Sequence, residues 1–358
     1  MAEPGNLLEY AQRRVGTSLR GKYLLVRVLG VGGMASVYEA THRNGTRVAV
    51  KVLHGETAAI ADVKRRFLRE GYIANQIQHP GVVRIIDDDE DEDGTAFIVM
   101  ELLEGRTLES EVTACGGRMP VERVVAITDA LLSVLDAAHA AGVVHRDIKP
   151  DNVFLTFAGP KVLVFGIARL AESSSATRSG QTMGTAEFMA PEQAGGQVRE
   201  IDGRTDLFSL GAMMFTLLSG EFVQQNARTA IEYMVFTATK PARPIATAMP
   251  HIDPGLADVI DTALAFEKGR RWASAKQMRT ALRAATMGTA STVHAPSNAE
   301  YERRQAVNAQ PTAPSAPSAS QPPEAPRPPE VSRTGTLPLG AMSIDPVAEA
   351  LRAREGKK

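Results

Sequence analysis

Residues 145–152 read His-Arg-Asp-Ile-Lys-Pro-Asp-Asn and follow a segment, Val121–Ala141, whose apolar residues recur at helical spacing. The string places a carboxylate at Asp147, an amine at Lys149 and a carboxamide at Asn152. An oriented carboxylate can accept a proton from a hydroxyl group, and a carboxamide oxygen can ligate a hard metal ion. Such groups act only when they are held in place, so the string predicts a rigid loop beneath a ligand site.

A glycine-rich stretch lies far upstream of this loop, between two predicted strands. It reads Gly30, Val31, Gly32, Gly33, Met34, Ala35, Ser36 and Val37. Glycines let a backbone approach a polyphosphate and turn N–H groups towards it, because a Cβ would collide or would block positive φ. Ala35 stands where the pattern G-x-G-x-x-G has its third glycine. Alone, the stretch predicts either a phosphate-binding loop or an ordinary hairpin turn.

Two charged residues downstream of the glycines favour the phosphate-binding alternative. Lys51 ends the strand-like string Val48-Ala49-Val50-Lys51, and Glu70 follows in the middle of a predicted helix. A lysine at the end of a buried type of strand is unlike a solvated surface charge. A lysine on a strand followed by a glutamate on a helix fits an ion pair that positions the lysine on two phosphates.

The apolar pattern divides the chain into a β-rich lobe and a larger helical lobe, which predicts a ligand cleft between them. Five strands are predicted by alternating apolar residues and one helix by its spacing. The strands are Tyr23–Leu29, Ser36–Ala40, Val48–Leu53, Val83–Asp87 and Ala96–Glu101, with an Asn44-Gly45 turn and a helix over Asp62–Gln78. Later helices are clearest over Val121–Ala141, Thr205–Ser219 and His251–Phe266. We interpret the acidic run Asp87–Asp93 as a solvated loop.

These motifs together resemble those of the bacterial eukaryotic-like (Hanks-type) Ser/Thr protein kinases. The resemblance implies an α+β bilobal protein-kinase fold, with a five-stranded N-lobe carrying one helix and a mainly helical C-lobe. It also implies ATP as the nucleotide and Mg²⁺ or Mn²⁺ as the metal. Asp147 would orient the substrate hydroxyl, Lys149 would contact the γ-phosphate and Asn152 would bind the metal.

The resemblance also implies the residues that contact ATP. They are Gly30, Val31, Gly32, Gly33, Met34, Ala35, Val37, Ala49, Lys51, Glu70, Met100, Glu101 and Leu103. Met100 would be the gatekeeper, and the backbone of Glu101 and Leu103 would pair with the adenine edge.

Other implied roles lie in the C-lobe. Thr185 and the string Ala190-Pro191-Glu192 match the end of an activation segment, Asp206 would support the catalytic loop, and Arg271 would pair with Glu192. The candidate phosphorylation sites are Thr177, Ser179 and Thr182. Arg146, beside Asp147, could bind such a phosphate and order the segment.

The chain departs from the family at Val164-Phe165-Gly166, where the family motif is Asp-Phe-Gly. The aspartate ligates magnesium, whereas valine offers no oxygen. About 1.4 kcal/mol is a tenfold rate, so losing several kcal/mol of charge stabilisation predicts a rate loss of about a hundredfold to more than ten-thousandfold. The alternatives are an impaired kinase and a pseudokinase that binds ATP as a scaffold or regulator of a partner. We favour the kinase slightly, because the other motif residues are present.

A third alternative, a small-molecule phosphotransferase of kinase-like fold, carries less weight. Such relatives lack the activation segment with Ala-Pro-Glu, which this chain has at 190–192.

Composition restricts the partners and the compartment. The chain has 40 basic and 41 acidic residues, so no bulk charge favours nucleic acid. No window reaches the about 18 apolar residues that a membrane span requires. The single Cys115 fits a reducing compartment, and we expect a cytoplasmic protein. A protein substrate or a regulated partner is expected, and homodimer formation stays open.

The domain boundaries follow from composition and from the motifs. We predict an N-terminal extension over 1–22, a kinase domain over 23–284 (N-lobe 23–103, C-lobe 104–284) and a tail over 285–358. The tail is rich in Pro, Ala and Ser, and it is predicted to be disordered because it cannot bury enough apolar surface. Its Pro-Pro pairs at 322–323 and 328–329 could dock in the aromatic groove of a binding domain, or the tail could be a passive linker.

Overall fold

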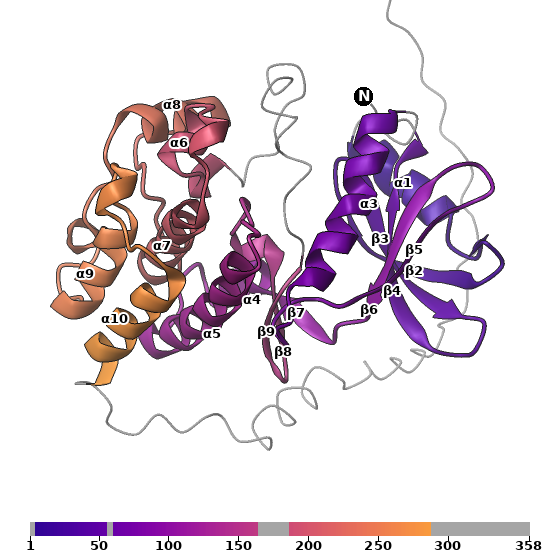
Figure 1. Cartoon of the computed structure of the whole chain (residues 1–358), viewed down its shortest axis with the longest axis horizontal. Coiled ribbons are helices and arrows are strands. Elements are labelled where there is room, and N and C mark those ends of the chain that lie inside the picture. Colours follow the sequence, from indigo (N-terminus) through magenta and orange to yellow (C-terminus); the bar gives the residue numbers. More distant parts are fainter. Residues whose placement is uncertain (1–3, 56–59, 164–185, 288–358) are drawn as a thin grey trace, which may run out of the picture. The chain divides into compact units, whose positions relative to one another are not determined.

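A computed structural model describes residues 4–55, 60–163 and 186–287 of the 358-residue chain (Figure 1). Val164 and the sites at Thr177, Ser179, Thr182 and Thr185 lie outside the described residues. The predicted tail also lies outside them, apart from the end of the last helix.

The N-lobe is built on a six-stranded antiparallel sheet in the order β1-β2-β3-β4-β6-β5. The strands are β1 (Ser18–Leu19), β2 (Tyr23–Val31), β3 (Ala35–His42), β4 (Arg47–Leu53), β5 (Ile85–Glu90) and β6 (Ala96–Glu101). The five predicted strands are confirmed. The added strand, β1, pairs with β2 at the sheet edge and is too short to show alternation in the sequence. Gly45, at φ +88°, turns the chain between β3 and β4 as predicted.

Two helices pack on opposite faces of this sheet, whereas one was predicted. Alternate residues of β4 belong to different apolar clusters, because side chains of a strand alternate between its faces. Val48 and Val50 lie in the cluster that buries Ala11 of α1 (Pro4–Arg13). Ala49 lies in the cluster that buries Phe67 of α3 (Ala61–Gln76). The helix that the sequence did not predict, α1, therefore belongs to the N-lobe core.

The interpretation of the acidic run as a solvated loop is wrong for its first half. Asp87 to Glu90 belong to β5 and pair with β6. Their side chains have partners: the Tyr23 hydroxyl donates to Asp87 at 2.8 Å, and Lys64 donates to Glu90 at 2.5 Å. Burial, together with the hydrogen bond to Asp87, raises the pKa of Tyr23 to about 12. Pairing with β6 overrode the low strand propensity of aspartate.

The C-lobe is mainly helical, as predicted. Its helices are α4 (Leu108–Ala114), α5 (Val121–Ala140), α6 (Pro191–Ala194), α7 (Gly203–Ser219), α8 (Ala230–Thr239), α9 (Pro254–Ala263) and α10 (Ala275–Met287). Short 3₁₀ turns are η1 (Pro150–Asn152), η3 (Ala186–Phe188), η4 (Val198–Glu200), η5 (Ile245–Thr247) and η6 (Lys268–Arg270). A three-stranded sheet, too short to be predicted, contains β7 (Gly105–Thr107), β8 (Val153–Thr156) and β9 (Gly159–Val162). None of the helices in the described part is long and apolar enough to cross a membrane.

Helix α7 forms the centre of this lobe, because it is apolar on every side and almost all of its residues are buried. It begins where the Asp202 carboxylate accepts from the Arg204 N–H, and it ends at Gly220, which adopts φ +73°. A polar side chain on α7, such as that of Asp206, is therefore held in the interior at a fixed position.

Hydrogen bonds join the two lobes. The N–H of Val83 donates to the carbonyl of Val162 in β9 at 3.1 Å, and the N–H of Val162 donates to Gly81 at 2.7 Å. Lys161, also in β9, donates to the Glu101 carboxylate at 2.6 Å. The segment that leads to residue 164 is therefore tied to the N-lobe.

Candidate active site

The loop at 145–152 is fixed by one buried carboxylate. Asp206 of α7 has no exposed surface and accepts from the backbone N–H of His145 at 2.8 Å and of Arg146 at 2.7 Å. Nε2 of His139 lies 2.8 Å from the same carboxylate and donates to it, because a carboxylate only accepts. Charged acceptors in low dielectric bind N–H groups strongly, so Asp206 holds the loop backbone in one position.

Arg146 adopts a left-handed backbone conformation, with φ +68°. Such a conformation costs a non-glycine residue about 1–3 kcal/mol and persists where its surroundings enforce it. Here its N–H is bound by Asp206, and its carbonyl accepts from the Gln193 side chain at 2.8 Å. Gln193 also accepts from the Ala190 N–H at 3.2 Å, which ties the loop to α6.

The two reactive groups predicted on the loop contact each other. The side-chain amide NH₂ of Asn152 donates to the backbone carbonyl of Asp147 at 2.7 Å and to the Asp147 carboxylate at 2.8 Å. The Asp147 N–H donates to the His145 ring at 3.2 Å. Because Asn152 uses its amino group in this way, its side-chain oxygen is the atom left to ligate a cation. Lys149 lies 3.8 Å from Asp151, whose side chain is half exposed.

The predicted nucleotide contacts gather around one apolar cluster of the N-lobe. Ala35, Ala49 and Met100 are buried in it, and Met34, Val37 and Leu103 pack against it. The structure thus brings together residues from the glycine-rich loop, from β4 and from the segment after β6. These residues are close enough together to line one face of a single ligand site.

The glycines agree with the prediction only in part. Gly30, Gly32 and Gly33 do not adopt positive φ, so that part of the prediction is wrong. A Cβ at Gly30 or Gly33 would meet no atom within 4 Å, whereas a Cβ at Gly32 would lie 3.3 Å from the Ala35 carbonyl oxygen. Side chains at Gly30 and Gly33 would therefore occupy open space. A phosphate chain would need such open space in order to reach backbone N–H groups.

Lys51 extends from β4 towards α3, because its ammonium group lies 5.4 Å from the centre of the buried Phe67 ring. Glu70 lies on the same helix, and its side chain is outside what the structure describes. Glu101 accepts from Lys161 and from the Arg84 N–H through its side chain. That carboxylate therefore links the lobes, and the Glu101 N–H is also engaged, because it donates to the Arg84 carbonyl at 3.0 Å.

The oxygen donors suit a divalent cation only in part. Asn152 offers one oxygen, and Val164, in the undescribed segment, has none in its side chain. The Leu163 N–H donates to the Asn152 carbonyl at 3.0 Å, so residue 164 directly follows a residue anchored to the loop at 145–152. Within the described ranges, no group of three or more His, Cys, Asp or Glu could hold a metal.

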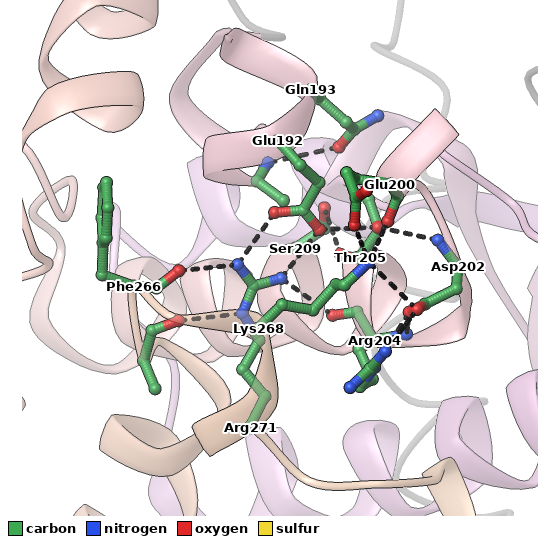
Figure 2. A network of polar contacts seen from close by, with 12 residues as sticks. Glu192, Gln193, Glu200, Asp202, Arg204, Thr205, Ser209, Phe266, Lys268 and Arg271 are labelled. Carbon is green, nitrogen blue, oxygen red and sulfur yellow. Dashed lines mark hydrogen bonds and ion pairs between the residues drawn. The ribbon is translucent and has the colours of Figure 1, made fainter. Parts of the chain in front are cut away.

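A buried ion pair anchors the far side of the site (Figure 2). Arg271 donates to both carboxylate oxygens of Glu192 at 2.9 Å, and to the Phe266 carbonyl at 3.2 Å. Thr205 also donates to Glu192, at 2.7 Å. Burial alone would raise the pKa of Glu192, but the bonds to Arg271 outweigh it and lower that pKa. The pair joins α6, next to Gln193, to the residue that follows η6, and the bond from Thr205 joins the same carboxylate to the start of α7, which carries Asp206.

The lowered pKa of the neighbouring Asp202 predicts that the fold loses stability in acid. Burial raises its pKa, but hydrogen bonds from Arg204 and Lys268 prevail and lower it from the ordinary 3.8 to about 2. A carboxylate with a lowered pKa stabilises the fold above the unfolded pKa and loses this effect as the pH falls towards the folded pKa. After allowance for solvent screening, the loss is about 1 kcal/mol, or about 2–4 °C in Tm.

We expect Tm to fall between pH 3.8 and about 2, and to fall less in Asp202→Asn. Thermal unfolding followed by circular dichroism checks this. Equal acid sensitivity of the two proteins would refute the assignment to Asp202.

Several residues that shape the site were not identified from the sequence. His139, Gln193 and Phe67 carry no motif signal and act only through folded contacts with Asp206, Arg146 and Lys51.

Comparisons with known proteins agree with this geometry. A family model described as protein kinase domain matches residues 23–282. The chain is 39% identical over 272 residues to serine/threonine-protein kinase Pkn1 of Myxococcus xanthus, covering 74% of this chain and 38% of that protein. It is 34% identical over 283 residues to serine/threonine-protein kinase PknA of Mycobacterium tuberculosis, covering 77% and 64%. The chain thus spans less than two thirds of the length of these relatives.

A solved structure, the PknI kinase domain of Mycobacterium tuberculosis, is also similar. It superimposes with a TM-score of 0.59 at 28% identity, and the match covers 76% of this chain and 98% of that one.

Proposed function

The chain belongs to the protein kinase family, and on this premise we propose that it transfers phosphate from ATP to Ser or Thr hydroxyls of proteins, at a rate lowered by Val164. One observation carries the proposal: Asp147 and Asn152 are joined by two hydrogen bonds on a loop whose backbone is held by buried Asp206. A protein that acted only as a scaffold would not need the side chains of Asp147 and Asn152 to be positioned in this way.

In the proposed reaction a substrate hydroxyl oxygen attacks the γ-phosphorus of ATP. The bond from that phosphorus to the ADP oxygen breaks, and the hydroxyl proton passes to the Asp147 carboxylate. The bond from Asn152 orients that carboxylate, and Lys149 would contact the γ-phosphate. Lys51 would contact the α- and β-phosphates, and the open space at Gly30 and Gly33 would admit them to the loop backbone.

A divalent cation, Mg²⁺ or Mn²⁺, would neutralise charge on the transferred group when bound. Asn152 would hold it through its side-chain oxygen. Val164 cannot contribute, so we propose that the cation is bound weakly and that the chemical step is slow.

A pseudokinase is the second candidate, and Val164 is the observation that favours it. Such a protein would bind ATP and regulate a partner without transferring phosphate. The two candidates share ATP binding and differ in turnover, so only a transfer assay separates them.

Arg146 supports a proposal for control by phosphorylation. Within the described residues its buried Nε has no hydrogen-bond partner. Burial lowers the pKa of Arg146, and this effect outweighs the opposing effect of the Asp206 charge. An unpaired buried guanidinium nitrogen suits a phosphate oxygen. We propose that phosphate on Thr177, Ser179 or Thr182 binds there and orders the segment before Thr185.

ATP binding should depend on Lys51 but not on Val164. At ATP concentrations about 100 times Kd, binding stabilises the fold by about 2.7 kcal/mol, which raises Tm by several degrees. We expect this rise in Tm in the unmodified chain. We expect it to be lost in Lys51→Ala, because the phosphates then lose the positively charged ammonium group of Lys51. Thermal shift with ATP, with and without Mg²⁺, measures it.

Lys22→Ala, which removes a lysine far from the predicted site, should keep the full rise. No rise in the unmodified chain at several millimolar ATP would contradict the nucleotide site itself.

A further inference from the structure

Helix α1 lies outside the matched family region, which begins at residue 23, and yet it is part of the N-lobe. Ala11 is fully buried in the same cluster as Leu25 and Tyr38. Arg14, just after the helix, lies 3.8 Å from Asp91 in the turn between β5 and β6. The helix is therefore held at both its apolar face and its end, and it has a fixed position on the sheet.

Tyr10 of α1 contacts the segment that leaves β4. Its ring meets the ring of His54 edge to face, with centroids 6.2 Å apart and planes at 76°. A Cβ added to Gly55 would lie 3.6 Å from the Tyr10 hydroxyl oxygen, which is ordinary van der Waals contact. His54 is buried and follows Lys51 by three residues along the chain. The helix thus packs on the end of the strand that carries Lys51.

His54 in turn binds the end of the glycine-rich loop that leads into β3. Its Nε2 lies 2.9 Å from the Ser36 hydroxyl, and its backbone N–H donates to the Met34 carbonyl at 2.8 Å. Ser36 is 1% exposed and shares a further hydrogen bond with Tyr38, beneath the loop. Met34 and Ser36 flank Ala35, whose carbonyl accepts from the Gly32 N–H at 2.9 Å. His54 therefore connects α1 to the loop backbone.

We propose that Tyr10 of α1 is a positioning residue for the glycine-rich loop, acting through His54 on Ser36 and Met34. The inference rests on the proposed function, because the loop is taken to bind the phosphates of ATP. Neither Tyr10 nor His54 touches the nucleotide in this account. The Tyr10 ring keeps His54 in the orientation that bonds Ser36, and the loop is thereby held near its ATP-bound form before ATP arrives.

Two measurements on the full chain test the proposal. The first is hydrogen exchange of the backbone amides of residues 30–37 without nucleotide, and the second is the Kd for ATP. An aromatic pair contributes about 0.5–1.5 kcal/mol, so Tyr10→Ala should speed exchange and raise Kd by about two- to tenfold. Ser36→Ala should have a similar effect. In the double variant, Tyr10→Ala with Ser36→Ala, the increase in Kd should be smaller than the product of the two single increases, because both substitutions break the same connection.

Matched variants separate positioning from simple stabilisation. Tyr10→Phe keeps the ring and should match the unmodified chain in both measurements. Leu8→Ala removes a half-exposed apolar side chain from the same helix and should leave residues 30–37 unchanged. If Tyr10→Ala does not fold, Tyr10→Leu retains apolar volume without the ring and should show the same effects.

A lower Tm in Tyr10→Ala or Tyr10→Leu, with unchanged exchange and unchanged Kd, would overturn the proposal and leave α1 a stabilising element only. Absence of ATP binding by the unmodified chain would instead contradict the proposed function. In that case exchange at residues 30–37 still decides whether Tyr10 holds the loop.

Discussion

Val164→Asp is expected to autophosphorylate at least about tenfold faster than the unmodified chain. The substitution returns a carboxylate to a position that directly follows Leu163, whose N–H is bonded to the Asn152 carbonyl. Asn152 already offers one oxygen, so the new carboxylate would complete a pair of protein ligands for the cation. Incorporation of labelled phosphate from ATP with Mg²⁺ measures the rate.

Val164→Leu is the matched control, because it changes the side chain at the same position without adding an oxygen. Its rate should equal that of the unmodified chain. An equal increase in both variants would show that the gain does not come from a metal ligand. A rate in the unmodified chain that already matches Val164→Asp would refute the account of the metal.

Asp206→Ala is expected to lower the free energy of unfolding by about 3–5 kcal/mol, because it leaves buried donors without their charged acceptor. The backbone N–H groups of His145 and Arg146 and the ring of His139 all lose their partner. The strained backbone at Arg146 would also lose one of its two restraints. Denaturant unfolding measures the change, and activity in the Val164→Asp background should be lost as well.

Ser209→Ala provides the control on the same buried helix. Ser209 only donates to the Thr205 carbonyl, at 3.3 Å, so its removal should cost less than about 1.5 kcal/mol. If Asp206→Ala costs no more than Ser209→Ala, Asp206 does not hold the loop as described.

The order of strands and helices along the chain could be predicted, because the motifs that identify it are short contiguous stretches of sequence. The string at 145–152 and the lysine of β4 each specify a residue type at a fixed spacing, and the strands around them alternate clearly. The lobes, the five main strands and the major helices followed from these patterns. Arg271 also lies against Glu192 as the family resemblance implied, although the two residues are far apart in the sequence.

The remaining features depend on contacts that no local pattern encodes. The carboxylates of β5 were assigned to a loop because a run of like charges is usually solvated, but Tyr23, Lys64 and the pairing with β6 outweigh that tendency. Helix α1 is short, and only the sheet beneath it makes Ala11 a core position. Gln193 reaches the Arg146 carbonyl across a separation of 47 residues, which spacing cannot predict. Gly30 and Gly33 lack the positive φ that the glycine-rich pattern suggested, and a Cβ at either would meet only open space.

The central claim is that the loop at 145–152 performs phosphoryl transfer and that Val164 limits it. The most direct test compares initial rates of phosphate incorporation in Val164→Asp and in Val164→Asp with Asp147→Asn, after equal ATP binding has been verified for both. The amide that replaces the Asp147 carboxylate in the double variant is a poor proton acceptor, so its rate should fall by at least about a hundredfold. Equal rates in the two proteins, or no transfer by Val164→Asp to itself or to a generic basic protein despite tight binding of ATP and Mg²⁺, would contradict the account and favour the pseudokinase.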